Sequence, residues 1–134
     1  DGLLDLVEVN RSTPVEVWRN VGAGTPSIPQ PLGTWVAVRL RQPAPNRDAV
    51  GAAFQVRVGS STVVHTVTVG GGHASGDHGW THLGLGGVER AEIRVTWPDG
   101  CVGDWVAVEA GTFAIIERDA PAADVWVPGT GGTP

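Results

Sequence analysis

Three histidines and an aspartate lie close together in the middle of this sequence. His73, Asp77, His78 and His82 fall within ten residues. On an extended segment, a two-residue period puts His78, Trp80 and His82 on one face. Imidazole and carboxylate groups held near one another are ligands for zinc or another transition metal. The spacing matches no established zinc motif, so a metal site at His73, His78 and His82 stays a hypothesis.

Groups that could perform catalysis are scarce. The sequence has no Gly-x-Ser-x-Gly elbow and no phosphate-binding glycine loop. Cys101 is the single cysteine, and a lone cysteine on a strand is usually a small buried hydrophobe. The carboxylates of Asp99, Asp104 and Glu109 are scattered, so they do not form a glycosidase-like pair. We therefore expect a protein that is not an enzyme.

Tryptophan supplies most of the aromatic surface, since the chain has six tryptophans, two phenylalanines and no tyrosine. Trp97 continues the apolar face of its strand and is expected in the core. Trp35 has the opposite phase from Val36 and Val38, which predicts an outward or edge position. Exposed tryptophan is used by sugar-binding surfaces and by protein interfaces. Trp35, Trp80 and Trp105 are the candidate binding residues.

Alternation of apolar and polar residues is the main structural signal, and it predicts strands. It occurs in three segments, at 36–41, 54–58 and 91–97. The segment 63–69 is β-branched almost throughout, which predicts a well-covered strand. Further strands are expected near 4–9, 15–19, 79–83, 102–108 and 112–117.

Turn residues separate these strands. Trp97-Pro98-Asp99-Gly100 suits a β-turn, because proline presets φ at its second position and glycine is favoured at its fourth. A segment rich in proline and glycine at 22–33 is expected to be a linker. Many short strands with frequent turns predict an all-β fold, either a sandwich or a partly closed barrel. Of the two, we favour an antiparallel β-sandwich.

Charge and hydropathy exclude two classes of partner. The net charge is −5 and all nine basic side chains are arginines without a cluster, so nucleic acid is not an expected partner. No apolar stretch reaches the roughly 20 residues that a membrane-spanning helix needs. The tryptophans favour a protein or a glycan as the partner instead.

Four motifs in order give the stretch 35–118 a resemblance to the ASPIC/UnbV domain of the cartilage acidic protein-like family. They are Asn46-Arg47-Asp48-Ala49-Val50-Gly51-Ala52, Gly70-Gly71-Gly72 with Ser75, His82-Leu83-Gly84-Leu85-Gly86, and Val95-Thr96-Trp97-Pro98-Asp99-Gly100. The resemblance implies a β domain near the end of secreted or surface proteins and no established reaction. It also implies a hydrogen-bonding role for His82.

The motif residues also have structural interpretations. Asn46 can hold an Asx turn, and Arg47 and Asp48 could pair or cap backbone groups. Gly51 suits a bulge. Gly84 and Gly86 are expected at the turn after a strand.

The first ten residues, Asp1-Gly2-Leu3-Leu4-Asp5-Leu6-Val7-Glu8-Val9-Asn10, resemble the end of an FG-GAP repeat from an integrin-type β-propeller. The resemblance implies that Asp1 and Asp5 belong to a calcium loop, here incomplete because calcium takes six to eight oxygen ligands. Calcium is therefore the one possible cofactor. The expected organisation is a repeat end at 1–20, a linker at 21–34, the β domain at 35–118 and a tail at 119–134.

We expect a non-catalytic binding, adhesion or assembly module outside the cell, on a secreted or surface protein. Its partner would be a protein or glycan, with upstream propeller repeats or a neighbouring subunit against residues 1–20. One alternative is a carbohydrate-binding module that uses exposed tryptophans. Another is a structural subunit of an extracellular filament or surface layer, which an unpartnered strand at 4–9 would favour.

Overall fold

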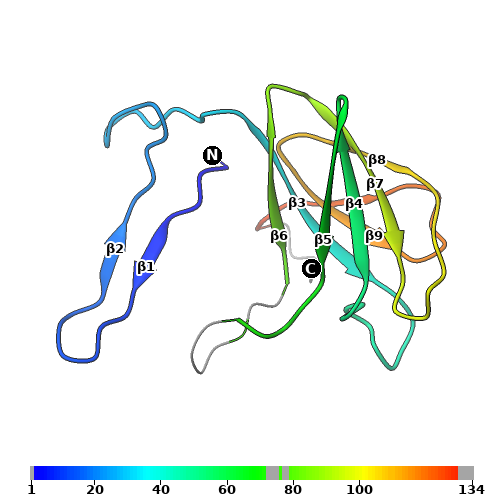
Figure 1. Cartoon of the computed structure of the whole chain (residues 1–134). Helices are drawn as coiled ribbons and strands as arrows, with labels where there is room; N and C mark the ends of the chain where they lie inside the picture. The colour runs from blue at the N-terminus through cyan, green and yellow to red at the C-terminus, as the bar shows by residue number, and fades with distance from the viewer. Residues whose placement is uncertain (1, 72–75, 77–78, 130–134) are drawn as a thin grey trace.

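The computed structural model describes residues 2–71, 76 and 79–129, and its regular structure is entirely β (Figure 1). The strands are β1 (Leu6–Glu8), β2 (Glu16–Trp18), β3 (Thr34–Arg41), β4 (Ala53–Val58), β5 (Ser61–Thr66), β6 (Thr81–Gly86), β7 (Arg90–Thr96), β8 (Val106–Glu109), β9 (Thr112–Glu117) and β10 (Asp124–Trp126). In the described part of the chain, no helix has the length and apolarity needed to cross a membrane.

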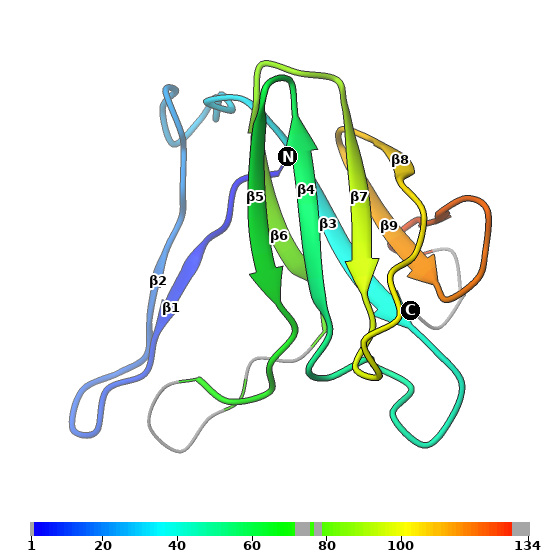
Figure 2. The ribbon, with the colours of Figure 1, turned by 45° about the vertical axis from the view of Figure 1, so that its right-hand side comes forward.

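Eight strands form two four-stranded sheets that face each other. One sheet has the order β10-β9-β3-β6 and the other β5-β4-β7-β8. In Figure 2, β5, β4 and β7 stand side by side in front of β6, β3 and β9. The chain is thus the predicted β-sandwich, with one difference: β9 pairs with β3 in parallel. The tight turn at Gly111 carries the chain from β8 in one sheet to β9 in the other, so β9 enters beside β3 in the same direction.

The core lies between the sheets and is built by the predicted alternation. Val36, Val38 and Leu40 of β3 are buried. They meet Phe54 of β4 and Ile93 of β7, which are also buried, in one hydrophobic cluster. The period-two pattern therefore assigned the inner face of these strands correctly.

The segment 63–69 was predicted to be well covered, and this is wrong. Val63 and Val64 of β5 are 51% and 59% exposed. β5 is the last strand of its sheet and pairs with β4 alone. β-Branched residues indicate an extended backbone, but they do not indicate how many neighbours that backbone has.

Part of the expected tail belongs to a sheet. β10 pairs antiparallel with β9, with Trp126 opposite Phe113. The sequence did not reveal this strand because three residues are too few to show a period. The expected linker also has structure, since Ala23 N–H donates to the carbonyl of Gln30 and Thr25 N–H to that of Ile28.

β1 and β2 form a separate two-stranded ribbon. They pair antiparallel with each other and join neither sheet of the sandwich. Both ribbon views show them projecting away from the two sheets (Figures 1 and 2).

Candidate interaction surfaces

The outer face of the sheet β10-β9-β3-β6 carries a layer of aromatic rings, which we call the aromatic face. Its members are Trp35, Trp80, His82, Phe113 and Trp126. Strand alternation explains their position, because Trp35 and Ala37 have the opposite phase from the core residues of β3. Ala37 lies opposite both His82 and Phe113 in the sheet. It is only 1% exposed, so this outer face is covered rather than open to water.

Phe113 is the centre of the aromatic face. Its ring meets Trp35, Trp80 and Trp126 edge-on, with centroid distances of 5.3, 5.1 and 5.3 Å. Trp35 stacks on His82 at 5.3 Å, and Trp80 stacks on Trp126 at 5.6 Å. Edge-to-face and offset-stacked pairs at these distances are the favoured aromatic geometries.

Sequence reasoning found Trp35, Trp80 and His82 but missed Phe113 and Trp126. A signal was present, because the runs Trp35-Val36-Ala37-Val38 and Phe113-Ala114-Ile115-Ile116 are apolar at successive positions. Such runs are typical of strands that are covered on both faces. Only the strand pairing reveals that the two runs lie side by side.

A groove of about 420 Å³ opens on the aromatic face. Trp35, Trp80, His82 and Phe113 line it together with the chain's own residues 2–4. Nε2 of His82 lies 3.2 Å from the carbonyl oxygen of Gly2. Because a carbonyl can only accept, this contact is a hydrogen bond in the tautomer that protonates Nε2.

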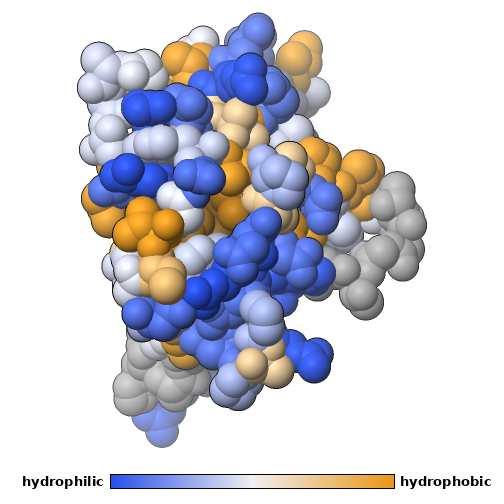
Figure 3. Space-filling view, turned by 90° about the vertical axis from the view of Figure 1, so that its right-hand side faces the viewer, coloured by the Kyte–Doolittle hydropathy of each residue, from blue (hydrophilic) through white to orange (hydrophobic). Residues whose placement is uncertain are grey.

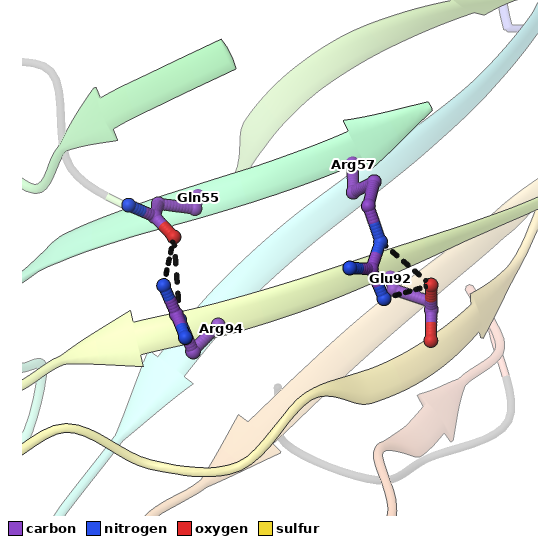
Figure 4. Close-up of polar contacts among 4 residues, drawn as sticks. All are labelled: Gln55, Arg57, Glu92 and Arg94. Carbon is purple, nitrogen blue, oxygen red and sulfur yellow. Dashed lines mark hydrogen bonds and ion pairs between the residues drawn. The ribbon is translucent and has the colours of Figure 1, made fainter. Parts of the chain in front are cut away.

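The outer face of the other sheet is polar, and we call it the arginine face (Figure 4). Nε and Nη2 of Arg57 both donate to one carboxylate oxygen of Glu92, at 2.9 and 2.6 Å. Arg94 donates in the same way to the side-chain oxygen of Gln55, at 3.2 and 2.8 Å. These residues are direct cross-strand neighbours on β4 and β7, so the pairs stabilise the sheet.

Trp105 completes the arginine face. The guanidinium carbons of Arg57 and Arg94 lie 4.2 and 4.7 Å from the centre of its ring. From the side on which β7 and β8 lie in Figure 1, the surface is mostly hydrophilic, with apolar residues in small groups (Figure 3). This face is thus a solvated network of cross-strand pairs.

The six tryptophans differ in how far they are buried. Trp97 is buried as predicted, and Trp35, Trp80, Trp105 and Trp126 are half-buried. Trp18, on the ribbon, is the most exposed of them at 55%, although sequence reasoning did not select it. Trp35 is contacted by His82, Trp80 by Trp126, and Trp105 by two arginines. None of the three selected tryptophans therefore presents two open ring faces.

Asn46 organises the loop between β3 and β4. Its Nδ2 donates to the carbonyl of Val50 at 2.8 Å, and its Oδ1 accepts the N–H of Val50 at 3.0 Å. This spans four residues, which is wider than the Asx turn we expected. Asp48 pairs with Arg39 at 3.0 Å rather than with Arg47.

Three glycines of the family motifs differ in backbone conformation and in their surroundings. Gly51 has a φ of +89° in open space, so its backbone conformation is the constraint. Gly86 ends β6 with a φ of +67°. Gly84 lies within β6 opposite Trp35, with neither a positive φ nor a close neighbour, so the predicted turn role of Gly84 is wrong.

The expected turn at 97–100 is present and is joined to Arg118, the residue that follows β9. Gly100 N–H donates to the carbonyl of Trp97 at 2.9 Å, and Gly100 has a φ of +88°. One carboxylate oxygen of Asp99 accepts the N–H of Cys101, and the other accepts Arg118 at 2.6 Å. Cys101 itself is exposed, unlike the usual lone cysteine. Its place after the turn, outside any strand, removes it from the core.

Comparison with known proteins identifies the domain that carries these loops. A family model described as ASPIC and UnbV matches residues 42–123, which is more than half of the chain. This chain belongs to the ASPIC and UnbV family. No curated protein matches it, and no solved structure does.

The match covers the Asn46 loop, the arginine face and the turn at Asp99 of this ASPIC and UnbV domain. Strand β3, with Trp35, lies outside the match. The aromatic face is therefore built partly from the matched domain and partly from the segments that flank it.

Asp99 gives the ASPIC and UnbV domain a predicted acid dependence. The hydrogen bond from Arg118, and then that from Cys101 N–H, hold the pKa of Asp99 below its ordinary value. The folded chain therefore keeps this carboxylate ionised at a pH where the unfolded chain protonates it. The stabilisation is complete above the ordinary aspartate pKa, and it is lost as the pH falls through the folded value.

We expect Asp99→Asn to lower the Tm slightly at neutral pH, with a difference that shrinks below about pH 4. Thermal melts of the parent and variant across that range measure it. Asp104→Asn, at an exposed carboxylate nearby, is the control and should show no such trend. A constant difference at every pH would contradict the role of the ion pair.

The predicted metal sites lie partly outside the described residues. Asp1, His73 and His78 fall there. Among the residues that the structure describes, no three His, Cys, Asp or Glu side chains are grouped to hold a metal. Oδ1 of Asp5 accepts the N–H of Asn20 at 2.8 Å, which joins the residue before β1 to the chain just after β2 at one end of the ribbon.

Proposed function

We propose that this ASPIC and UnbV domain is a non-catalytic assembly module of a secreted or surface protein, and that the ribbon β1–β2 is its contact surface. The family resemblance supports the extracellular setting. The observation that carries the proposal is the exposure of the ribbon's apolar side chains.

The ribbon exposes apolar residues on both faces. Leu6 lies opposite Trp18, and Val7 lies opposite Val17, on alternate faces. Leu6, Val7 and Val17 are 61%, 59% and 69% exposed. An isolated two-stranded hairpin is marginally stable in water, so burial of these side chains against a protein partner would stabilise it.

The edges of the ribbon favour a partner that adds a strand. Within the described part of the chain, β1 and β2 form a sheet of two strands with no third. Backbone groups at a free edge pair readily with another strand. The resemblance of the first ten residues to the end of a propeller repeat supports upstream repeats as that partner. A neighbouring subunit is the alternative partner.

We expect the protein to self-associate weakly through the ribbon when no other partner is present. The double substitution Val7→Thr with Val17→Thr keeps the shape and strand preference but puts two hydroxyls on the contact face. Burial of an unpaired hydroxyl costs about 1–3 kcal/mol. The dissociation constant should therefore rise about tenfold or more. Sedimentation velocity over a wide concentration range measures this.

Val102→Thr is the matched control, because Val102 is similarly exposed but lies on the sandwich. It should leave association unchanged. Hydrogen exchange adds a second measurement, in which ribbon amides in the dilute protein should exchange far faster than those of β4. A monomer at every concentration whose ribbon amides are as protected as β4 would contradict the proposal.

A glycan-binding function has weaker support. The rings of Trp35, Trp80 and Trp105 are each contacted on one side by neighbouring groups. A flat platform of open, coplanar rings, which a sugar chain would need, is not formed by these three residues.

A further inference from the structure

We propose that the aromatic face is a docking site for the peptide segment that precedes the ribbon, and that it selects glycine at position 2. The occupant is the chain's own Gly2–Leu4, an apolar extended segment. This inference concerns a different surface from the ribbon contact and does not depend on the ribbon's partner.

The contacts at Gly2 are close and specific. A Cβ added at Gly2 would lie 1.8 Å from Nε1 of Trp35, so the glycine backbone rests directly on the indole. The carbonyl of Gly2 also meets Nε2 of His82, which stacks on the same indole. One residue is therefore held by contact with the Trp35 indole and by a hydrogen bond together.

Two features exclude a side chain at position 2. Gly2 has a φ of +77°, a conformation that residues with a Cβ rarely adopt. The Trp35 ring cannot move away easily, because it lies between His82 on β6 and Phe113 on β9. The selectivity thus comes from backbone conformation and from a ring fixed by its neighbours.

Docking at Gly2 also positions the ribbon. Leu3 packs near Gly22, since a Cβ at Gly22 would meet Leu3 Cδ2 at 3.3 Å. Asp5 accepts the N–H of Asn20, as described above. The end of the ribbon at which β1 begins and β2 ends is thereby tied to a segment that contacts the sandwich. The aromatic face fixes where the ribbon projects.

The first test is Gly2→Val in the whole chain. The docked segment should be released, so that the backbone resonances of residues 3–5 shift toward random-coil positions, while those of β4 and β7 do not change. The indole N–H resonance of Trp35 should shift in the same variant. Gly87→Val is the control, because Gly87 has open space and no positive φ, and it should change neither measurement.

The second test supplies the segment from outside. A synthetic peptide with the sequence of residues 1–10 is added to the Gly2→Val protein. It should shift the Trp35 and His82 resonances saturably, whereas the same peptide with valine at position 2 should not. The affinity of the free peptide will be low. In the intact chain the segment is tethered, so its high effective concentration keeps it bound even if the contact itself is weak. Unchanged resonances of residues 3–5 in Gly2→Val, no shift with either peptide, or equal shifts with both peptides would overturn the proposal.

Discussion

Phe54→Ala is expected to destabilise the domain by about 3–5 kcal/mol, as for other buried phenylalanine truncations. Phe54 lies on β4 between the sheets and is 1% exposed. It belongs to the same core cluster as Ile93 and Val36. The cavity left behind would have walls from both sheets, which cannot collapse without shifting strands. Chemical denaturation of parent and variant measures the loss.

The chain's second phenylalanine provides the matched comparison. Phe113 is half-buried on the aromatic face and contacts three tryptophans. Phe113→Ala should cost less, about 1–3 kcal/mol, since an outer layer can relax more freely. It should also loosen residues 2–4. A cost equal to that of Phe54→Ala would mean that this face is a second core rather than a docking surface.

Asn46→Ala is expected to cost about 2–3 kcal/mol, because it removes two hydrogen bonds and leaves both backbone groups of Val50 without their partner. The bonds measure 2.8 and 3.0 Å and are partly buried. The backbone carbonyl of Asn46 also accepts from Gln42 at 2.8 Å, and the alanine variant keeps this bond.

Asn46→Asp separates the two bonds. A carboxylate keeps the acceptor for the N–H of Val50 but loses the donor to its carbonyl. The cost should therefore fall between the parent and Asn46→Ala when both variants are measured by denaturant unfolding. Arg47→Ala is the control, since Arg47 is exposed, and it should stay close to the parent. A loss at Arg47 as large as that at Asn46 would contradict the structural role assigned to the asparagine.

The sequence by itself determined which segments are extended and which face of most strands is buried. Val36, Val38, Phe54, Val56, Ile93 and Val95 were assigned to the core by their alternation and are buried. Alternation is a local property, because successive side chains on a strand must point to opposite sides. The turn at Trp97-Pro98-Asp99-Gly100 is also local, since proline and glycine restrict or permit particular backbone angles. These local signals predicted the all-β class, and the pairing of the strands decided between a sandwich and a barrel.

Only the tertiary structure decided which strands are neighbours, and the candidate surfaces depend on that. β5 resembles a covered strand in sequence, yet Val63 and Val64 are exposed on this last strand of its sheet. Trp35, Phe113 and Trp126 are far apart in the chain, and they meet because β3, β9 and β10 are adjacent. Gly2 and Trp35 are separated by the whole ribbon in sequence, and they meet only because the folded chain places them side by side. Strand order depends on how the two sheets pack around one core. That packing involves the whole chain, so the local alternation of residues does not encode it.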